Sequence, residues 1–458
     1  MNDTGRPPAA PAPVRVGELL RLAGPVVASR LAIMAMGLTD TLVVGRFSAR
    51  ELAYHALGWS LTSIVLVGGI GLLVGTQVLT ARHRGAGRPH ATAAVLRRGL
   101  RHAVVIGLVA TIGLLIGGPP LLRATLPPDL AAGAIPPMRI FALSLTPYLV
   151  ADALIFWFEG HERPGRPAAA LWLANAVNLA LALWLVPGRS PFGVEGAVAA
   201  GWATLGARTF LMLVLLGMLV AWRPASAWGV FRRQPAAPAE ASEQRRIGGA
   251  AGASYLLEAG GFSLLNLVAG QVSAAVVAAW AVVGNVASIV FMLPLGLANA
   301  TGVLVARCVG AGDAEGVGRA FRLGLGLAVG SLAFVSLGLL GGAAMVARLY
   351  TADPAVLALL PQGLALGALF FMADGAQVVA AHGLRARGDI WWPTAVHGLA
   401  YVVVMLPLAW GLAVGWGWGL SGILWAVIAA SLLSAAALVA RFRALGVRLP
   451  GEAAQRTV

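Results

Sequence analysis

Residues 45–89 read GRFSARELAYHALGWSLTSIVLVGGIGLLVGTQVLTARHRGAGRP, and residues 270–314 read GQVSAAVVAAWAVVGNVASIVFMLPLGLANATGVLVARCVGAGDA. The two stretches align without a gap at an offset of 225 residues. Carried on to Leu100 and Leu325, about 21 of 56 aligned pairs are identical. Internal duplication on this scale is typical of membrane transporters, so we predict a chain of two related halves.

The repeat continues with small shifts, since GVEGAV at Gly193 matches GLSGIL at Gly419. Between the halves lies a charged stretch rich in Pro and Ala, at about 223–248, which has the composition of a linker. Each half is predicted to hold six spans, and because six is even, both halves insert the same way round. Parallel repeats of this kind are related by an axis along the membrane normal, with a cavity between them.

The composition indicates an integral membrane protein. Hydrophobic residues make up 59% of the chain and charged residues only 11%, less than half of the roughly 25% usual in soluble domains. Apolar runs of about 20 residues recur along it, each long enough to cross a bilayer as a helix. Strands of a membrane barrel would alternate with a period of two, a pattern that is absent. We therefore predict an all-α fold with twelve transmembrane helices, at approximately 25–46, 53–80, 92–118, 137–159, 168–187, 195–221, 249–269, 275–305, 319–346, 356–382, 393–413 and 419–440.

The net charge of +15 comes from arginine alone, because the chain contains no lysine. The arginines fall mainly in every second connection between spans, as the positive-inside rule requires of cytoplasmic loops. Nucleic-acid binding is therefore not expected, since the arginines do not lie on one face of a domain. Both termini and the long middle loop are predicted to be cytoplasmic.

The remaining organisation follows from these spans. We expect a disordered leader and short cytoplasmic segment at 1–24, not a removable signal peptide. It is followed by an N-terminal half at 25–222, a linker at 223–248, a C-terminal half at 249–441 and a cytoplasmic tail at 442–458. The single cysteine, Cys308, excludes an internal disulfide framework and a cysteine-based metal cluster.

Four carboxylates fall inside predicted spans: Asp40, Asp152, Glu258 and Asp374. A charge at the bilayer centre costs about 2.5–3.5 kcal/mol on insertion scales, so such a residue faces the bundle interior, is protonated or has a partner. Burial favours the protonated acid and a nearby cation favours the carboxylate. An acid held between these influences can exchange a proton for a cation, as coupled transport needs.

The duplication separates these acids from scaffold residues. At the 225-residue offset, Asp40 is matched by Leu265 and Glu258 by Ile33. At the later offset of 223, Asp374 is matched by Ala151, beside Asp152. Glycines of the scaffold are repeated and the acids are not, which favours a functional role for the acids. The alternative is that each is a buried hydrogen-bond acceptor, or a partner of an intramembrane arginine such as Arg30 or Arg208.

Several amides form a second group of candidates for a polar cavity: Asn175, Asn178, Gln377 and Asn285. Amides of this kind also serve as hydrogen-bonding contacts between transmembrane helices, and the sequence leaves both readings open. No histidine or cysteine has the spacing of a metal ligand.

Three motifs together resemble the MATE (multidrug and toxic compound extrusion) transporters, especially their NorM-like bacterial branch. The motifs are LAGPVVASRLAIMAMGLTDTLVVGRFSARELA from Leu22, PLGLANATGVLVARCVGAGDAEGVGRA from Pro294 and ADGAQVVAAHGLRARGDIWWP from Ala373. The resemblance extends from about Leu19 to Arg441. It implies a V-shaped antiporter in the bacterial cytoplasmic membrane, a monomer that expels organic cations in exchange for Na+ or H+ and has no other cofactor.

The resemblance also implies roles for individual residues. Glu258 in the seventh span and Asp374 in the tenth match the cation site of the NorM-like branch, so they are the candidate Na+ ligands. Asp40 matches a site proposed for the N-terminal half in other branches. Asn175 and Asn178 lie three residues apart there, where the family's usual spacing is four.

Two other functions remain open at the level of sequence. One is a flippase for lipid-linked precursors or natural products from the same superfamily, which would favour additional spans and a cationic cavity. The other is an integral membrane transferase, which would need clustered catalytic residues near a membrane face. We therefore expect a transporter and not an enzyme.

Overall fold

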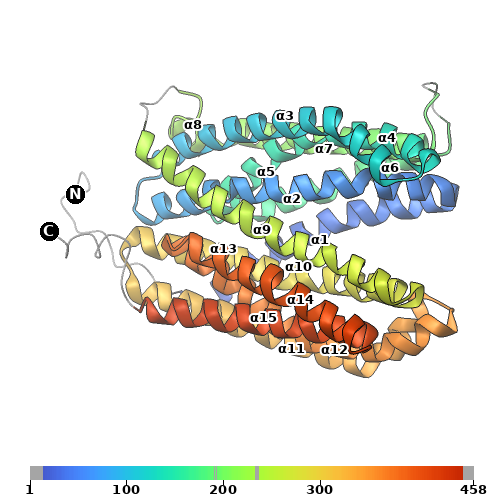
Figure 1. The fold of residues 1–458 in the computed structure, drawn as a ribbon. Coiled ribbons are helices and arrows are strands. Elements are labelled where there is room, and N and C mark those ends of the chain that lie inside the picture. The colour runs from blue at the N-terminus through green and yellow to red at the C-terminus, as the bar shows by residue number, and fades with distance from the viewer. Residues whose placement is uncertain (1–13, 190, 192, 233–236, 447–458) are drawn as a thin grey trace, which may run out of the picture.

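The computed structural model describes residues 14–189, 191, 193–232 and 237–446, and throughout these residues the elements are helices (Figure 1). The predicted all-α fold is confirmed. The helices are α1 (Val16–Phe47), α2 (Ala49–Gly85), α3 (Ala91–Thr125), α4 (Pro128–Leu143), α5 (Leu145–Gly160), α6 (Gly165–Leu185), α7 (Gly196–Ala221), α8 (Arg223–Ala227), α9 (Pro238–Val272), α10 (Ala274–Ala311), α11 (Ala314–Tyr350), α12 (Pro354–Arg387), α13 (Trp391–His397), α14 (Met405–Trp410) and α15 (Gly419–Ala444), with π-helical turns η1 (Gly398–Val404) and η2 (Gly411–Gly415) around α14.

Eleven helical segments of the described chain are long and apolar enough to cross a membrane. Helices α4 and α5 together form one of them, and α13 to η2 form another. The seventh predicted span is α9, whose 35 residues extend about 50 Å at 1.5 Å per residue. Its apolar part contains Glu258 and several glycines and serines, which lower its hydropathy. With α9, the structure accounts for the twelve predicted spans.

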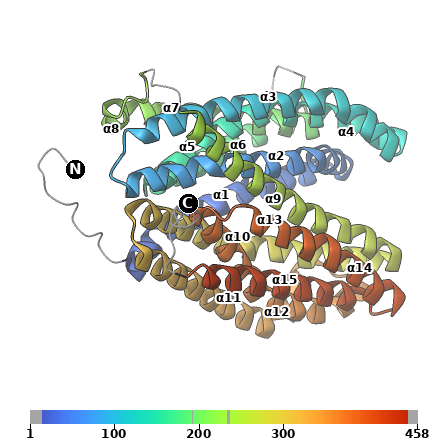
Figure 2. The same ribbon diagram turned by 60° about the vertical axis from the view of Figure 1, so that its left-hand side comes forward.

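The helices form two bundles that lie side by side (Figures 1 and 2). One bundle contains α1 to α7 and the other α10 to α15, with α9 running obliquely from the first toward the second. At the interface α2 packs along α9, and α1 packs along α10. The predicted two-half architecture is thus present, and two long helices on each side form the interface, α1 and α2 against α9 and α10.

Several helices extend past the predicted boundaries. Helix α1 begins at Val16, inside the predicted leader, and α15 ends at Ala444, inside the predicted tail. Helix α9 begins at Pro238, inside the predicted linker, with Pro at the first turn where its missing N–H costs nothing. The hydropathy pattern locates the bilayer and not the helix ends, since polar residues continue a helix in water. The parts of these segments at 1–13, 233–236 and 447–458 lie outside the described residues.

The sequence repeat reappears as structural symmetry where α2 crosses α10. A Cβ atom on Gly85 would overlap the carbonyl oxygen of Arg307, and a Cβ atom on Gly310 would overlap the carbonyl oxygen of Arg82. Both pairs are related by the 225-residue offset. Only glycine allows this approach of two backbones, so the repeated glycines hold the two halves together.

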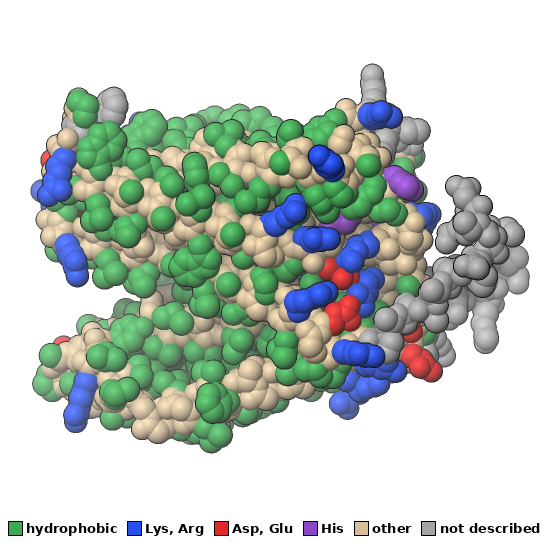
Figure 3. Space-filling view, turned by 180° about the vertical axis from the view of Figure 1, so that it is seen from behind, with side chains coloured by type: hydrophobic (Ala, Val, Ile, Leu, Met, Phe, Trp, Pro, Cys, Tyr) green, Lys and Arg blue, Asp and Glu red, His purple; other side chains and the backbone are tan. Residues whose placement is uncertain are grey.

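Charged side chains gather at the same end of the molecule as this crossing (Figure 3). The Arg307 guanidinium lies 2.5 Å from a Glu18 carboxylate oxygen and 3.0 Å from one of Glu162. The Arg82 guanidinium donates to the Ala386 carbonyl at 2.8 Å and lies 2.5 Å from Glu243. These contacts join α10 to the first half and α2 to the second, so the arginine-rich end is closed.

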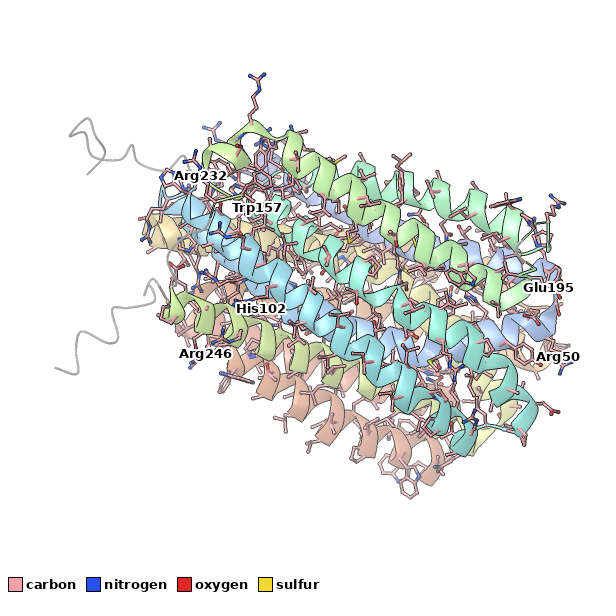
Figure 4. The ribbon with its side chains drawn as sticks, turned by 90° about the horizontal axis from the view of Figure 1, so that it is seen from above. Arg50, His102, Trp157, Glu195, Arg232 and Arg246 are labelled. Carbon is pink, nitrogen blue, oxygen red and sulfur yellow. The ribbon has the colours of Figure 1, made fainter. Side chains whose placement is uncertain are left out.

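The two ends of the molecule differ. Arg232 and Arg246 lie at the end that holds the arginine cluster, and Arg50 and Glu195 lie at the opposite end (Figure 4). At that opposite end the two halves separate into an open cleft (Figure 3). The shape agrees with the V predicted from the resemblance.

Candidate functional site

A cavity of about 640 Å³ lies in the second half, beside the interface with the first. Its wall is formed mainly by α9, α10 and α12, and Val67 and Ile70 of α2 contribute from the first half. Aromatic side chains dominate the apolar part of the wall: Tyr255, Phe262, Trp280, Phe291 and Phe370. Two carboxylates reach this apolar wall, Glu258 and Asp374.

The structure brings the two predicted acids together through an amide. Gln377 Nε2 donates to Glu258 Oε1 at 3.0 Å and to Asp374 Oδ1 at 3.1 Å. Asp374 and Gln377 lie one helical turn apart on α12, and Glu258 faces them from α9. The Glu258 side chain is 15% exposed, whereas Gln377 is fully buried. The amide therefore ties together two acids that would otherwise repel each other.

Behind Glu258 lies a chain of polar contacts. The Ser254 hydroxyl lies 2.7 Å from His397 Nδ1 and accepts a hydrogen bond of 2.6 Å from Arg385 Nη2. His397 Nδ1 is also 3.8 Å from Glu258 Oε2. Arg385 is a buried cation that interacts electrostatically with Glu258, and its guanidinium also lies over the Tyr255 ring at 5.5 Å. Glu258 therefore has polar or charged neighbours on α12 (Arg385) and on α13 (His397).

Local backbone features bring α9 close to these neighbours. A Cβ atom on Gly261 would lie 3.0 Å from the Tyr401 carbonyl oxygen, so a glycine here lets α9 lie against η1. Glu258 precedes Gly261 by three residues and therefore shares this face of α9. Tyr401 belongs to η1, and π-helical turns are rare and frequent at functional sites.

Asp40 occupies a separate polar site in the first half. Thr204 Oγ1 donates to Asp40 Oδ2 at 2.7 Å, and Asn178 and Arg208 interact electrostatically with the same carboxylate. The Arg208 side chain is itself held by Ser144, to which Nη1 donates at 2.8 Å. Asp40 and the second-half acids therefore lie in different bundles, as predicted.

Asp152 is fully buried in α5, away from the cavity wall. Its electrostatic neighbours are Arg30 and Glu159. Arg30 Nη2 lies 3.4 Å from Glu159 Oε1, and Gln77 Nε2 donates to Glu159 Oε2 at 2.7 Å. The sequence left open that an intramembrane acid pairs with Arg30. In the structure Arg30 contacts Glu159 and is an electrostatic neighbour of Asp152.

Two of the predicted cavity amides lie elsewhere. Asn175 Nδ2 donates to the Ala32 carbonyl at 2.8 Å, which joins α6 to α1 as a contact between helices. Asn285 is exposed on α10 and accepts a hydrogen bond of 2.7 Å from the Tyr350 hydroxyl. Asn285 does not belong to the wall of this cavity, whereas its neighbour Gly284 does. One residue along a helix rotates a side chain by about 100°.

Sequence reasoning missed several residues around the site. Glu159 is the last residue of the predicted span 137–159, yet its side chain lies inside the bundle and the residue is 2% exposed. His397, Tyr401 and Arg385 are polar residues near or inside apolar spans, which was a usable signal. Their convergence on Glu258 was not visible, because their partners lie more than 100 residues away along the chain.

The described residues hold no group of three or more His, Cys, Asp or Glu side chains that could bind a metal ion. The Glu258 and Asp374 pair with Gln377 offers oxygen ligands, which suit hard cations. The same carboxylates line an aromatic cavity, so they can also attract an organic cation. The faces of the aromatic rings would add to this attraction.

Comparison with known proteins assigns the chain to a family. The MatE family model matches residues 25–184 and 250–410, which correspond to the two halves. The probable multidrug resistance protein NorM of Caulobacter vibrioides is 49% identical over 443 residues, covering 94% of this chain and 92% of that protein.

Solved structures show the same fold at low sequence identity. A eukaryotic MATE transporter, AtDTX14, is 18% identical with a TM-score of 0.84, covering 93% of this chain and 94% of that one. An outward-facing multidrug resistance MATE transporter of the MOP superfamily is 19% identical with a TM-score of 0.85, covering 94% and 96%. The matching halves, the shared fold and the NorM relative agree, and this chain belongs to the MatE family.

Proposed function

We propose that this protein is a secondary active antiporter of the bacterial cytoplasmic membrane that exports organic cations in exchange for Na+ or H+. It works as a monomer, with both termini in the cytoplasm, and the two halves rock against each other in alternating access. The observation that carries the proposal is the pair of carboxylates, Glu258 and Asp374, at the wall of an aromatic cavity.

The geometry supports exchange at one site. Glu258 and Asp374 line the cavity, and Gln377 donates a hydrogen bond to each of them. A substrate cation and a coupling ion would each neutralise these acids, so occupation by one disfavours occupation by the other. Competition of this kind links the export of one cation to the entry of another.

The orientation follows from the charges. The closed end holds the arginine cluster that the positive-inside rule assigns to the cytoplasm (Figure 3). The cleft then opens to the outside, where substrate is released. The name of the NorM relative, a probable multidrug resistance protein, supports export of organic compounds.

The observed cavity favours this function over the flippase alternative. A pyrophosphate group would need cationic side chains on the wall, whereas the charged residues on the wall are both acids. A transferase is disfavoured for a different reason: the NorM relative and the structural neighbours are named as resistance proteins or transporters.

The first prediction removes one negative charge at a time. In proteoliposomes loaded with a fluorescent organic cation, we expect Glu258→Gln and Asp374→Asn each to abolish efflux driven by an imposed Na+ or H+ gradient. The amide side chains keep the shape of the acids but lack the negative charge to which the substrate cation and the coupling ion bind in turn. The measurement is the initial efflux rate under each gradient separately.

Two exposed acids provide matched controls. Asp129→Asn and Glu315→Gln make the same chemical changes outside the bundle interior and should leave efflux unchanged. Full gradient-driven efflux in both cavity mutants would remove these acids from the mechanism.

A second prediction concerns the amide that joins the acids. Gln377→Leu removes both donors, and a hydrogen bond to a charged group contributes about 1.5–3 kcal/mol. We expect efflux to fall by roughly tenfold or more, since each 1.4 kcal/mol corresponds to a factor of ten. Gln377→Glu should lower efflux as well, because it adds a third acid. An unchanged rate in the leucine variant would show that the amide does not organise the site.

A further inference from the structure

Two ion pairs cross the interface between the halves at the arginine-rich end. The guanidinium of Arg307 on α10 lies 2.5 Å from a carboxylate oxygen of Glu18 on α1. The guanidinium of Arg82 on α2 lies 2.5 Å from a carboxylate oxygen of Glu243 on α9. Each pair therefore joins a helix of one half to a helix of the other.

The two ion pairs are copies of each other. The 225-residue offset that pairs Arg82 with Arg307 also pairs Glu18 with Glu243. The same offset relates α1 to α9 and α2 to α10. The arginine of each half thus meets the acid of the other half, as a twofold relation between two equivalent surfaces requires.

The glycine crossing of α2 and α10 fixes the backbone of both arginines. The carbonyl oxygen of Arg82 lies against Gly310, and that of Arg307 lies against Gly85. The arginine side chains are only 14% and 20% exposed. A side chain that leaves a fixed backbone and is largely covered loses less freedom when it forms an ion pair than a free surface side chain does.

Each arginine has a second partner in the opposite half. Arg307 also lies 3.0 Å from a carboxylate oxygen of Glu162, and Arg82 donates to the carbonyl of Ala386 in the last turn of α12. Glu162 has a φ of 56°, a conformation that is uncommon for a residue other than glycine. Its other carboxylate oxygen lies 2.8 Å from Arg84 of its own half. Glu162 therefore keeps an arginine partner when the halves separate at this end.

We propose that the pairs Arg307–Glu18 and Arg82–Glu243 form the gate of this transporter at the arginine-rich end. They hold that end closed in the present conformation and break when it opens to admit substrate. The inference rests on the proposed antiporter function, because alternating access requires this end to open. Partly exposed ion pairs suit a gate, since each contributes little and can break in every cycle.

The test measures how fast a maleimide labels Cys308 in the purified full-length protein, without substrate or an ion gradient. Cys308 is the single cysteine of the chain and is buried on α10. We expect Glu18→Gln and Glu243→Gln each to raise the labelling rate by roughly threefold, and the double variant by about tenfold. The glutamine side chains keep the shape of the acids but lack their charge.

Salt separates the effect of charge from an effect of packing. Raising the ionic strength from about 0.01 M to about 1 M shortens the Debye length from about 30 Å to about 3 Å. Labelling of the wild type should therefore become faster and approach the rate of the double variant. The rate of the double variant itself should change less, because its two crossing pairs are already absent.

A charge swap tests the contact between α2 and α9 directly. Glu243→Arg places a second cation beside Arg82 and should label faster than Glu243→Gln. Adding Arg82→Glu restores an ion pair of reversed direction, so the swapped variant should label more slowly than Glu243→Arg alone. It should also regain part of the gradient-driven efflux that Glu243→Arg loses. The recovery stays incomplete, since Arg82 also donates to the Ala386 carbonyl.

An ion pair inside one half gives the matched control. Arg441 and Asp389 both belong to the second half, and their nitrogen and oxygen lie 2.7 Å apart. Asp389→Asn should therefore label like the wild type. Glu315→Gln makes the tested chemical change at an exposed acid of α11 and should also leave labelling unchanged.

Three results would overturn the inference. The first is a double Glu18→Gln and Glu243→Gln variant that labels at the wild-type rate. The second is the same salt dependence in this double variant and in the wild type. The third is labelling of the swapped variant that is as fast as that of Glu243→Arg or faster. None of these touches the proposed antiport, which the efflux of Glu258→Gln and Asp374→Asn decides separately.

Discussion

Gly310→Val is expected to abolish transport and to open the arginine-rich end of the molecule. A Cβ atom at this position would overlap the Arg82 carbonyl oxygen, and a backbone atom in a helix cannot turn aside as a side chain can. Overpacking of a fitted interior costs about 1–3 kcal/mol, and overlap with backbone belongs at the upper end of that range. This cost applies to the conformation in which α2 and α10 touch. The conformation with a closed arginine-rich end is therefore disfavoured relative to one in which this end is open.

The chain contains a natural reporter for this change. Cys308 is its single cysteine and is buried on α10, two residues before Gly310. Labelling of Cys308 by a maleimide should be at least tenfold faster in Gly310→Val than in the wild type, since 1.4 kcal/mol shifts an equilibrium tenfold. Gly85→Val should act in the same way, because its Cβ atom would overlap the Arg307 carbonyl oxygen.

Glycines that face open space provide the comparison. A Cβ atom on Gly113 or on Gly326 would meet nothing within 4 Å, so Gly113→Val and Gly326→Val should label and transport like the wild type. If Gly310→Val kept both wild-type efflux and slow labelling, the close crossing of α2 and α10 would not be part of the closed state.

The same glycines show how far sequence reasoning reaches. The offset of 225 residues pairs Gly85 with Gly310 and Arg82 with Arg307, and the structure places these four residues at one crossing. Ser48 and Ser273, another pair at this offset, both cap the helix that follows them. A duplicated sequence implies duplicated contacts, so this part of the fold could be read from the alignment of the chain with itself.

The candidate site could be predicted only in part. Glu258 and Asp374 could be found because a charge inside an apolar span is costly, so a carboxylate there indicates a functional role. Gln377 was found through a motif, and its position between the two acids was not. That Asn285 lies off this cavity wall was not visible, because the hydropathy pattern of α10 does not say which side faces the cavity. Contacts between side chains more than 100 residues apart depend on helix rotation and crossing, which a single sequence does not determine.

The Arg30 and Glu159 pair is expected to hold the first half together. It joins α1 to α5, with side chains that are 6% and 1% exposed. Removing one partner of a buried ion pair costs about 3–5 kcal/mol, because the other charge stays buried. Arg30→Met leaves Asp152 and Glu159 as two buried acids, and Glu159→Leu leaves Arg30 without its contact and Gln77 without its acceptor. Both variants should lower the thermal unfolding midpoint of the purified protein by several degrees.

The double variant separates charge from packing. Arg30→Met combined with Glu159→Leu replaces the pair by apolar side chains, which is often neutral at buried sites. We therefore expect its midpoint to lie closer to the wild type than either single variant, a coupling that a double-mutant cycle measures directly. The half-exposed pair of Arg441 and Asp389, with oxygen and nitrogen 2.7 Å apart, gives the control. Arg441→Met should cost no more than about 1 kcal/mol, since exposed pairs contribute little. If the losses of Arg30→Met and Glu159→Leu simply added in the double variant, the two side chains would stabilise the bundle independently and not as a pair.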